Sequence, residues 1–310
     1  MAGRLDGRVA LVTGASKNIG KGIAVEIGRA GAAVYLTART LGTGADEPGS
    51  LRSTAAEIEA SGGQAFPVAC DHTDDAATTA VFEEIADRHG RIDLVVNVAS
   101  PDFSSMVGPA FWELPFDDMT RCLALGPRSN FVTTSLAARM MIPRGEGLVI
   151  NVSSHGAVHH LLSVPYGAGK AAIDKITADT ALELRSHGVA VVSLWPGLVL
   201  TEGLMALAAP GPDGRPQLSG LDISFGESPG FTGKACIALA TDPGVLARSG
   251  QAFKTTQLAR EYGFAEDDGS MPAEFLSLRD YLGEDRVPDY WKMVERFAFT
   301  PTGADGGSAR

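Results

Sequence analysis

The chain has 310 residues, which is enough to bury a large core in one α/β domain and leave residues for loops or a tail. Its 26 basic and 37 acidic residues give a net charge of -11, which argues against a surface for nucleic acid or anionic membrane. No apolar stretch is long enough to span a bilayer, so we expect an unanchored cytoplasmic protein. The cysteines at Cys70, Cys122 and Cys236 match no zinc or redox spacing, and buried, reduced thiols are expected.

Apolar segments of strand length alternate with amphipathic segments of helix length along most of the chain. This alternation predicts a parallel sheet with helices on both faces. Strands are expected at residues 9–13, 33–37, 64–70, 93–97, 147–153, 189–195 and 250–255. Helices are expected at residues 19–30, 50–60, 75–89, 117–141, 166–186 and 229–241. An aromatic-containing insert at 101–115 and a Pro/Gly-rich segment at 198–226 are expected to be irregular.

The regular alternation ends near residue 257. We therefore expect one doubly wound α/β domain of the Rossmann type at residues 1–256, followed by a C-terminal extension at 257–310. Within that extension, residues 289–299 fit a short amphipathic helix and residues 300–310 fit a disordered tail.

A turn rich in small residues, Thr13 to Gly22, joins the first expected strand to the first expected helix. Small residues let the backbone approach a pyrophosphate, and the helix N-terminus stabilises its negative charge. An ordinary tight turn is the alternative, but a position between the first strand and a helix favours a dinucleotide site. The candidate phosphate-binding residues are Gly14, Ser16, Lys17, Asn18, Ile19 and Gly20.

The second strand ends in Thr37-Ala-Arg39, without the carboxylate that would hold the ribose hydroxyls of NAD. Arg39 could instead meet the 2′-phosphate of NADP, with help from Lys17. An exposed arginine without this role is the alternative; we favour NADP(H) and leave NAD open. At the ends of the next two strands, Asp71 could bind the adenine amino group or cap a helix, and Asn97 lies where ligands collect.

Tyr166 and Lys170 are four residues apart in an expected helix, so their side chains share one face. A free phenol has a pKa of about 10, and a neighbouring ammonium group lowers it by favouring the phenolate. The pair is therefore a candidate general acid and base for hydride transfer, with a surface pair as the alternative. Nearby histidines, His155, His159 and His160, lack an acidic or cysteine partner at ligand spacing, so no metal site is predicted.

Six elements in order resemble the short-chain dehydrogenase/reductase family over residues 5–256. They are the Gly turn, Cys70-Asp71, Asn97-Val-Ala-Ser100, Asn151-Val-Ser-Ser154, Tyr166-x-x-x-Lys170 and Pro196-Gly197-x-x-x-Thr201. With Arg39 read as a contact for the 2′-phosphate, the resemblance implies an NADP(H)-dependent carbonyl reductase or alcohol dehydrogenase. It also implies a homodimer or homotetramer formed through the two long helices.

The resemblance also implies roles for single residues. Tyr166 would exchange a proton with the substrate oxygen, and Lys170 would lower its pKa and hold the nicotinamide ribose. A serine after the fifth strand would bind the same oxygen: the family's spacing fits Ser153, alignment of the serine pair fits Ser154, and we favour Ser154. On the cofactor side, Pro196, the backbone of Val199 and the hydroxyl of Thr201 would meet the nicotinamide end; Thr201 could equally cap a helix.

The chain departs from the family pattern at three places. Asn18 stands where the family has glycine, and asparagine tolerates a left-handed backbone well. Asn97-Val-Ala-Ser100 replaces Asn-Asn-Ala-Gly, which concerns sheet support more than chemistry. Gly126 replaces an asparagine that holds a water between the lysine and solvent, which implies another proton route or a slower enzyme. Gly126-Pro127 should also distort its helix.

Two alternatives to an NADP(H)-dependent reductase stay open, the first supported by Gly126 and the second depending on the role of Arg39. One is a non-catalytic NADP(H)-binding sensor or structural protein, and the other is an NAD-dependent alcohol dehydrogenase. For an enzyme, apolar residues near the sheet edge predict a pocket for a hydrophobic ketone, aldehyde or secondary alcohol. These residues are Phe103, Phe111, Trp112, Val158, Leu161, Leu162, Leu198, Leu204 and Met205.

Overall fold

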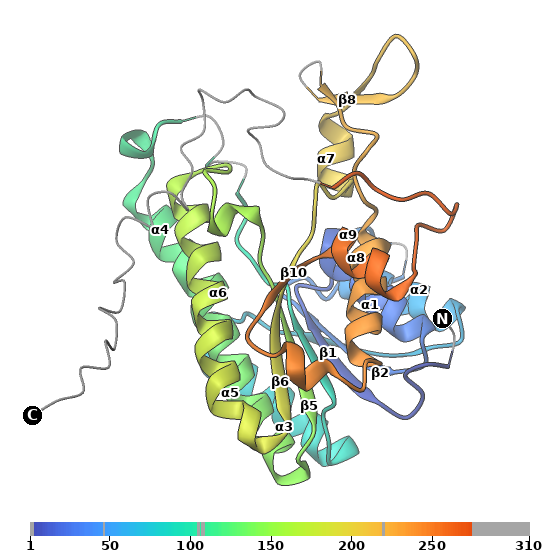
Figure 1. Cartoon of the computed structure of the whole chain (residues 1–310), viewed down its shortest axis with the longest axis vertical. Helices are drawn as coiled ribbons and strands as arrows, with labels where there is room; N and C mark the ends of the chain where they lie inside the picture. The colour runs from blue at the N-terminus through green and yellow to red at the C-terminus, as the bar shows by residue number, and fades with distance from the viewer. Residues whose placement is uncertain (1–2, 46, 104–105, 107–108, 219–220, 275–310) are drawn as a thin grey trace, which may run out of the picture.

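A seven-stranded parallel sheet forms the centre of the molecule, in the strand order β10-β6-β5-β4-β1-β2-β3 (Figure 1). The computed structural model describes residues 3–45, 47–103, 106, 109–218 and 221–274. The strands are β1 (Val9–Thr13), β2 (Ala33–Ala38), β3 (Gln64–Ala69), β4 (Leu94–Asn97), β5 (Gly147–Val152), β6 (Val189–Trp195) and β10 (Ala252–Lys254). The predicted doubly wound fold is confirmed.

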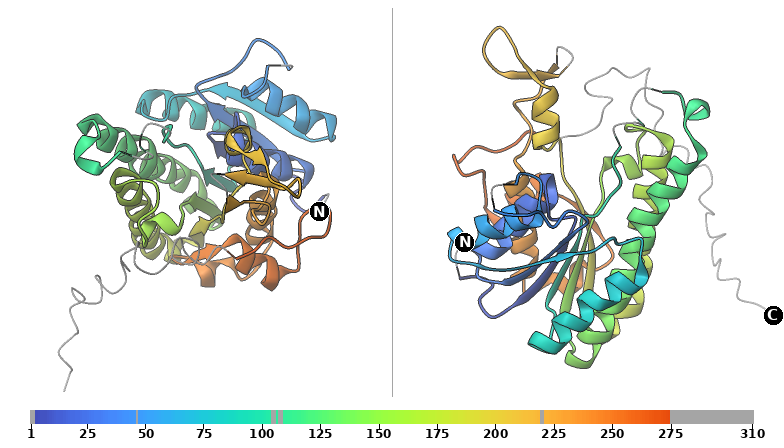
Figure 2. Two further views of the ribbon diagram at one scale, coloured as in Figure 1. Left: turned by 90° about the horizontal axis from the view of Figure 1, so that it is seen from above. Right: turned by 180° about the vertical axis from the view of Figure 1, so that it is seen from behind.

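Helices cover both faces of this sheet, as Figure 1 and the rear view in Figure 2 show. One face carries α1 (Asn18–Arg29), α2 (Leu51–Ala60), α8 (Pro229–Ala240) and α9 (Thr255–Tyr262). The other carries α3 (Asp75–His89), α5 (Ser129–Met141) and α6 (Val164–Leu184), with α4 (Phe116–Leu123) packed against α6. The sheet is therefore the middle layer of three.

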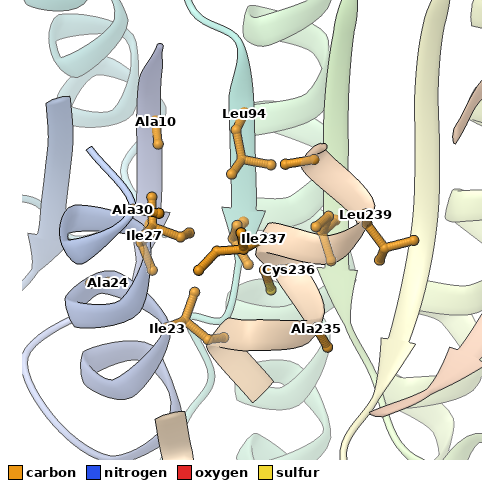
Figure 3. Packing of buried hydrophobic residues seen from close by; sticks show 14 of the residues in the cluster. Ala10, Ile23, Ala24, Ile27, Ala30, Leu94, Ala235, Cys236, Ile237 and Leu239 are labelled. Atoms are coloured by element: carbon orange, nitrogen blue, oxygen red, sulfur yellow. The ribbon is translucent and has the colours of Figure 1, made fainter. Parts of the chain in front are cut away.

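Alternate residues of each central strand supply the two cores. In β1, Ala10 and Val12 join the core under α1 and α8, whereas Val9 and Leu11 join the core under α3, α5 and α6. Successive side chains of a strand point to opposite faces, so a strand buried on both sides must be apolar throughout. Figure 3 shows the first core, where Ile23 of α1 and Ile237 of α8 lie against the sheet.

The predicted helix at 117–141 is wrong as a single helix, because it is divided into two. A π-helical turn at Ala124–Arg128 separates α4 from α5, and Leu125 within it has non-helical angles (φ -95°, ψ 19°). Pro127 lacks the N–H that a continuous α-helix would need. The distortion expected at Gly126-Pro127 is therefore confirmed.

Residues 198–226, expected to be irregular, contain regular structure. They form α7 (Glu202–Leu207) and a three-stranded antiparallel sheet of β7 (Ala209–Pro210), β8 (Pro216–Leu218) and β9 (Leu221–Asp222). Strands this short carry too few residues to show the alternation on which the prediction depends. From above, α7 and this small sheet overlie the central sheet (Figure 2).

The predicted boundary at residue 256 falls inside α9, and that division stays a prediction. Leu258 and Ala259 of α9 belong to the main core. The expected helix at 289–299 and tail at 300–310 lie outside the described residues. Within the described part of the chain, no helix is long and apolar enough to cross a membrane. All three cysteines are free and buried, as predicted.

Candidate active site

A cavity of about 560 Å³ opens where the parallel strands end. Its wall includes residues that follow β1, β2, β3, β4, β5 and β6, which is the edge where open α/β sheets bind ligands. Most of the predicted site residues line it: Gly14, Ser16, Lys17, Asn18, Ile19, Gly20, Arg39, Asp71, Ser154, Tyr166, Lys170, Pro196, Val199 and Thr201. Of the predicted cofactor and catalytic residues, Asn97 is the one that does not.

The Gly turn brings backbone close to backbone at two positions. A Cβ atom on Gly14, whose φ is 68°, would lie 3.0 Å from the backbone nitrogen of Ala99. A Cβ atom on Gly20 would lie 2.2 Å from the carbonyl oxygen of Gly14. Asn18 has a φ of 54°, the left-handed conformation that asparagine tolerates. This cradle at the start of α1 fits a pyrophosphate.

Arg39, directly after β2, and Lys17, in the turn between β1 and α1, are both exposed on the cavity wall. In the described part of the chain, neither makes an ion pair within 4.0 Å. Asp71 Oδ1 accepts hydrogen bonds from the backbone and hydroxyl of Thr73, at 2.9 and 2.8 Å, and these lower the pKa of Asp71. The alternative that Asp71 caps the next helix is wrong, because Asp74 caps α3.

Sequence reasoning missed His72, whose ring is buried beside this end of the cavity. Its Nε2 lies 2.8 Å from the Thr37 hydroxyl and its Nδ1 lies 3.2 Å from the Thr78 hydroxyl. Burial lowers the pKa of His72 to about 4, so the ring is neutral near pH 7. The only signal in the sequence was its position directly after Asp71 at a strand end.

The hydroxyl groups of Ser154 and Tyr166 meet at 2.8 Å. The Ser163 hydroxyl caps α6 and accepts from the Tyr166 backbone, which places the tyrosine in the first turn. Ser153 points elsewhere, since its hydroxyl donates to the Lys170 carbonyl at 3.2 Å. The geometry therefore separates the two serines, and Ser154 is the one beside the phenol.

The ammonium group of Lys170 lies under this pair. It donates to the Val152 carbonyl at 3.1 Å and stands 5.6 Å from the centre of the Tyr166 ring. Burial lowers the pKa of Lys170 to about 8, while Asp174 acts in the opposite direction. The predicted lowering of the Tyr166 pKa is wrong: burial raises it, and the Ser154 hydrogen bond offsets only part of that rise.

Asn97 is turned away from the cavity into a buried network. Its amide group donates to Asn151 Oδ1 at 2.9 Å, and its oxygen accepts from the Thr133 hydroxyl at 2.7 Å. Asn151 in turn donates to the Thr177 hydroxyl at 2.9 Å. The network ties β4 and β5 to α5 and α6, so Asn97 supports the sheet behind the site, and its contact with a cofactor stays a prediction.

The loop after β6 forms another part of the cavity wall. Thr201 caps α7 by accepting from the Leu204 backbone at 3.2 Å, which confirms the helix-cap alternative. A cofactor contact by the same hydroxyl is compatible with this cap and stays a prediction. Val199 pairs with Glu227, a residue that sequence reasoning missed.

Apolar side chains line the same cavity beside the reactive hydroxyls. Of the predicted substrate residues, those on its wall are Phe103, Leu161, Leu162, Leu198 and Leu204. Phe103 packs edge-on against the Tyr166 ring with centroids 4.8 Å apart. Phe111 and Trp112 instead line a neighbouring cavity of about 430 Å³ that shares Leu162. Two others, Val158 and Met205, line neither.

No metal site accompanies this arrangement within the residues that the structure describes. Groups of three or more potential ligands are absent there. His155 lies on the cavity wall beside Ser154, and burial lowers its pKa to about 4. Gly126 lies behind the wall, in the π-helical turn, while its neighbour Leu125 faces the cavity.

Known proteins share both the motifs and the fold. The family model described as short chain dehydrogenase matches residues 8–210. The chain is 41% identical over 288 residues to dehydrogenase/reductase SDR family member 1 of Mus musculus, covering 90% of this chain and 89% of that protein. The chain belongs to the short-chain dehydrogenase family. The resemblance inferred from its motifs is thus confirmed.

Solved structures of other short-chain dehydrogenases superimpose on the chain. A 7α-hydroxysteroid dehydrogenase complexed with NADH and 7-oxo glycochenodeoxycholic acid matches with a TM-score of 0.67 and 27% identity, over 81% of this chain and 93% of that one. A metagenomic short-chain oxidoreductase in complex with NADP matches with a TM-score of 0.62 and 28% identity, over 77% of this chain and 92% of that one.

Membership of the family gives the class of reaction. Short-chain dehydrogenases are oxidoreductases that act on CH–OH or C=O groups with a nicotinamide cofactor, and this protein is an oxidoreductase of that class. The cradle at Gly14 and Gly20 fits such a dinucleotide.

Proposed function

We propose that the protein is an NADP(H)-dependent oxidoreductase that transfers a hydride between the nicotinamide and a hydrophobic ketone, aldehyde or secondary alcohol. The observation that carries this proposal is the 2.8 Å contact between the Ser154 and Tyr166 hydroxyls, on the wall of a cavity that also includes the Gly turn. Such a pair can bind one substrate oxygen from two sides.

The preference for NADP(H) rests on charge at the end of β2. Arg39 and Lys17 are exposed on the cavity wall, and no carboxylate ends that strand. A 2′-phosphate would pair with these cations, whereas the ribose hydroxyls of NAD would lack their usual acceptor. The related structure with NADH keeps NAD as the competing choice.

The chain's own residues supply the proton chemistry. When bound, the cofactor provides or accepts the hydride. The Ser154 hydroxyl donates a hydrogen bond to the substrate oxygen and polarises the carbonyl, and the Tyr166 hydroxyl delivers the proton that this oxygen needs to become an alcohol. Burial raises the pKa of Tyr166, so the phenol is protonated near neutrality and holds the proton that carbonyl reduction consumes.

Lys170 supplies a positive charge at a fixed position beside Tyr166. With a pKa of about 8 it is mostly an ammonium ion at pH 7, and its hydrogen bond to the Val152 carbonyl fixes it under the Tyr166 ring. We assign it the nicotinamide ribose as its partner. In the oxidation direction the same groups act in reverse, with Tyr166 accepting the proton.

The apolar wall supports a hydrophobic substrate. Phe103, Leu161 and Leu198 stand on the cavity wall with the reactive hydroxyls, and burial of apolar substrate surface there is favourable. We further propose a homodimer or homotetramer formed through α5 and α6, on which Phe131 and Leu182 expose large apolar side chains. A cytoplasmic location remains part of the same proposal.

A titration of the purified protein with NADPH and with NADH, followed by nicotinamide fluorescence, tests the cofactor part. Tighter binding of NADPH is expected. The substrate part is tested by following NADPH oxidation with a series of ketones and aldehydes of increasing apolar size. Preference for NADH would overturn the role of Arg39, and reduction of none of the apolar carbonyls would overturn the substrate class.

A further inference from the structure

A buried carboxyl group, Glu227, lies behind the loop that follows β6. Its side chain accepts hydrogen bonds from the Gly197 backbone N–H at 3.1 Å, from the Thr232 hydroxyl at 2.9 Å and from the Thr255 hydroxyl. The residue is 1% exposed and does not line the cavity. In the part of the chain that is described, no lysine, arginine or histidine pairs with it within 4.0 Å.

The backbone of Glu227 holds the same loop. Its N–H donates to the Leu198 carbonyl and its carbonyl accepts from the Leu200 N–H, both at 2.8 Å. Val199, between them, pairs with Glu227 as an isolated parallel bridge. Glu227 therefore contacts four consecutive loop residues. Its main chain contacts residues 198–200, and its side chain accepts from Gly197.

The side chain also joins this loop to two distant elements. Thr232 lies in α8 and Thr255 begins α9 directly after β10, so the carboxylate links the loop to the helices that pack on the sheet. Another acid at this end of α8 is Glu266, which accepts from the backbone and hydroxyl of Ser228 at 2.7 and 2.6 Å. Glu266 thus fixes the start of α8, and within the described residues no hydrogen bond or ion pair joins its side chain to residues 197–200.

The loop held in this way is a wall of the cofactor cavity. Pro196, Gly197, Leu198, Val199 and Thr201 all line it. Burying a carboxyl group without a cationic partner opposes folding, so stability alone does not explain its three hydrogen bonds. We propose that Glu227 is a positioning residue that fixes residues 197–200 and thereby sets how tightly the nicotinamide end of the cofactor binds. This inference rests on the proposed function.

The test compares Glu227→Ala and Glu227→Asp with the wild type. Alanine removes the acceptor of the Gly197 N–H, and aspartate withdraws it by the length of one methylene group. We expect each variant to raise the dissociation constant of the preferred nicotinamide cofactor about tenfold, which corresponds to about 1.4 kcal/mol. Glu227→Gln keeps the length and one acceptor oxygen, so it should restore binding to within about threefold of the wild type.

Glu266→Ala is the matched control, because it removes a neighbouring carboxylate that does not touch the loop. Its dissociation constant should equal that of the wild type. Thermal unfolding is measured on every protein, since a merely structural role would lower the melting temperature and leave cofactor affinity unchanged. An unchanged dissociation constant in a folded Glu227→Ala or Glu227→Asp protein overturns the proposal. If the wild type itself binds neither NADPH nor NADH, the proposed function fails instead.

Discussion

Replacing Glu227 with glutamine should remove a pH dependence of folding stability that the buried carboxyl group creates. Burial raises the pKa of Glu227 from 4.5 to about 7, although its three neutral donors act in the opposite direction. The folded state therefore holds a proton that the unfolded state has released. The stability from this group is complete below pH 4.5 and is lost as the pH rises through 7.

The size of the effect follows from the two pKa values. The difference between 4.5 and about 7, at about 1.4 kcal/mol per pKa unit, gives about 3 kcal/mol over the whole range. Between pH 5 and pH 8, where the measurement is practical, the change is about 2 to 3 kcal/mol. Glutamine has the same shape and does not titrate, so the Glu227→Gln protein lacks this contribution at every pH.

Urea unfolding of both proteins at pH 5, 6, 7 and 8 gives the free energies of unfolding. The value for the wild type minus that for Glu227→Gln should decrease steadily with pH. Other groups that titrate, including the buried His72 and His155, cancel in this difference, and any altered packing in the variant adds a constant. A difference that does not change with pH would refute the reasoning, because it would show that the carboxyl group titrates alike in both states.

Three further predictions concern the site. Tyr166→Phe should lower turnover by about 10² to 10⁴-fold without changing cofactor affinity, and Ser154→Ala should also lower it. Ser153→Ala should leave turnover within about threefold, since its hydroxyl bonds the Lys170 carbonyl and Asp174 and not Tyr166; a reversed order of the two serines in steady-state kinetics would exchange their roles. Arg39→Asp should shift the ratio of kcat/KM for NADPH and NADH toward NADH by about tenfold, and an unchanged ratio would contradict the 2′-phosphate contact. Asn18→Ala should reduce stability by about 1 kcal/mol in thermal unfolding, because its φ is 54°, whereas Asn18→Gly should not.

The sequence was sufficient to predict the sheet because its strands are buried on both faces. Val9 to Val12 are apolar at every position, and such a run between a turn and helical segments leaves few other placements. The Gly turn could also be predicted from the sequence. Glycine is required at Gly14 and Gly20, because a Cβ atom at either position would displace neighbouring backbone. The strand order and the edge at which the site lies follow from the same fold.

Side-chain direction and burial could not be read in the same way. Asn97 ends a strand at the ligand edge, yet its amide is taken by Asn151 and Thr133, residues from separate elements. Glu227 looks like an exposed acid before a helix, and only the packing of α8, α9 and the loop shows that it is buried. Such contacts join residues distant in the chain, so no local pattern reports them.

The electrostatic state of Tyr166 shows the same limit. Spacing from Lys170 was enough to predict that the two side chains lie together, and the ammonium group does stand over the ring. Spacing said nothing about how completely the pair is buried, and burial decides the sign of the pKa shift. Near neutrality the phenol is therefore protonated and holds the proton that a carbonyl oxygen would take up.

Gly126 is the residue on which the non-catalytic alternative depends, and the packing around it weighs against that alternative. A Cβ atom on Gly126 would meet only Ile173 Cδ1, at 3.8 Å, which is an ordinary van der Waals contact. Steric crowding at the Cβ position therefore does not require glycine there. Meanwhile Lys170 stays buried with its pKa lowered to about 8, and the Tyr166 hydroxyl stays paired with Ser154. Burying a lysine in this way opposes folding, and perturbed groups of this kind cluster where chemistry is done. The intact Ser154, Tyr166 and Lys170 arrangement therefore favours an enzyme whose proton route does not require a side chain at residue 126.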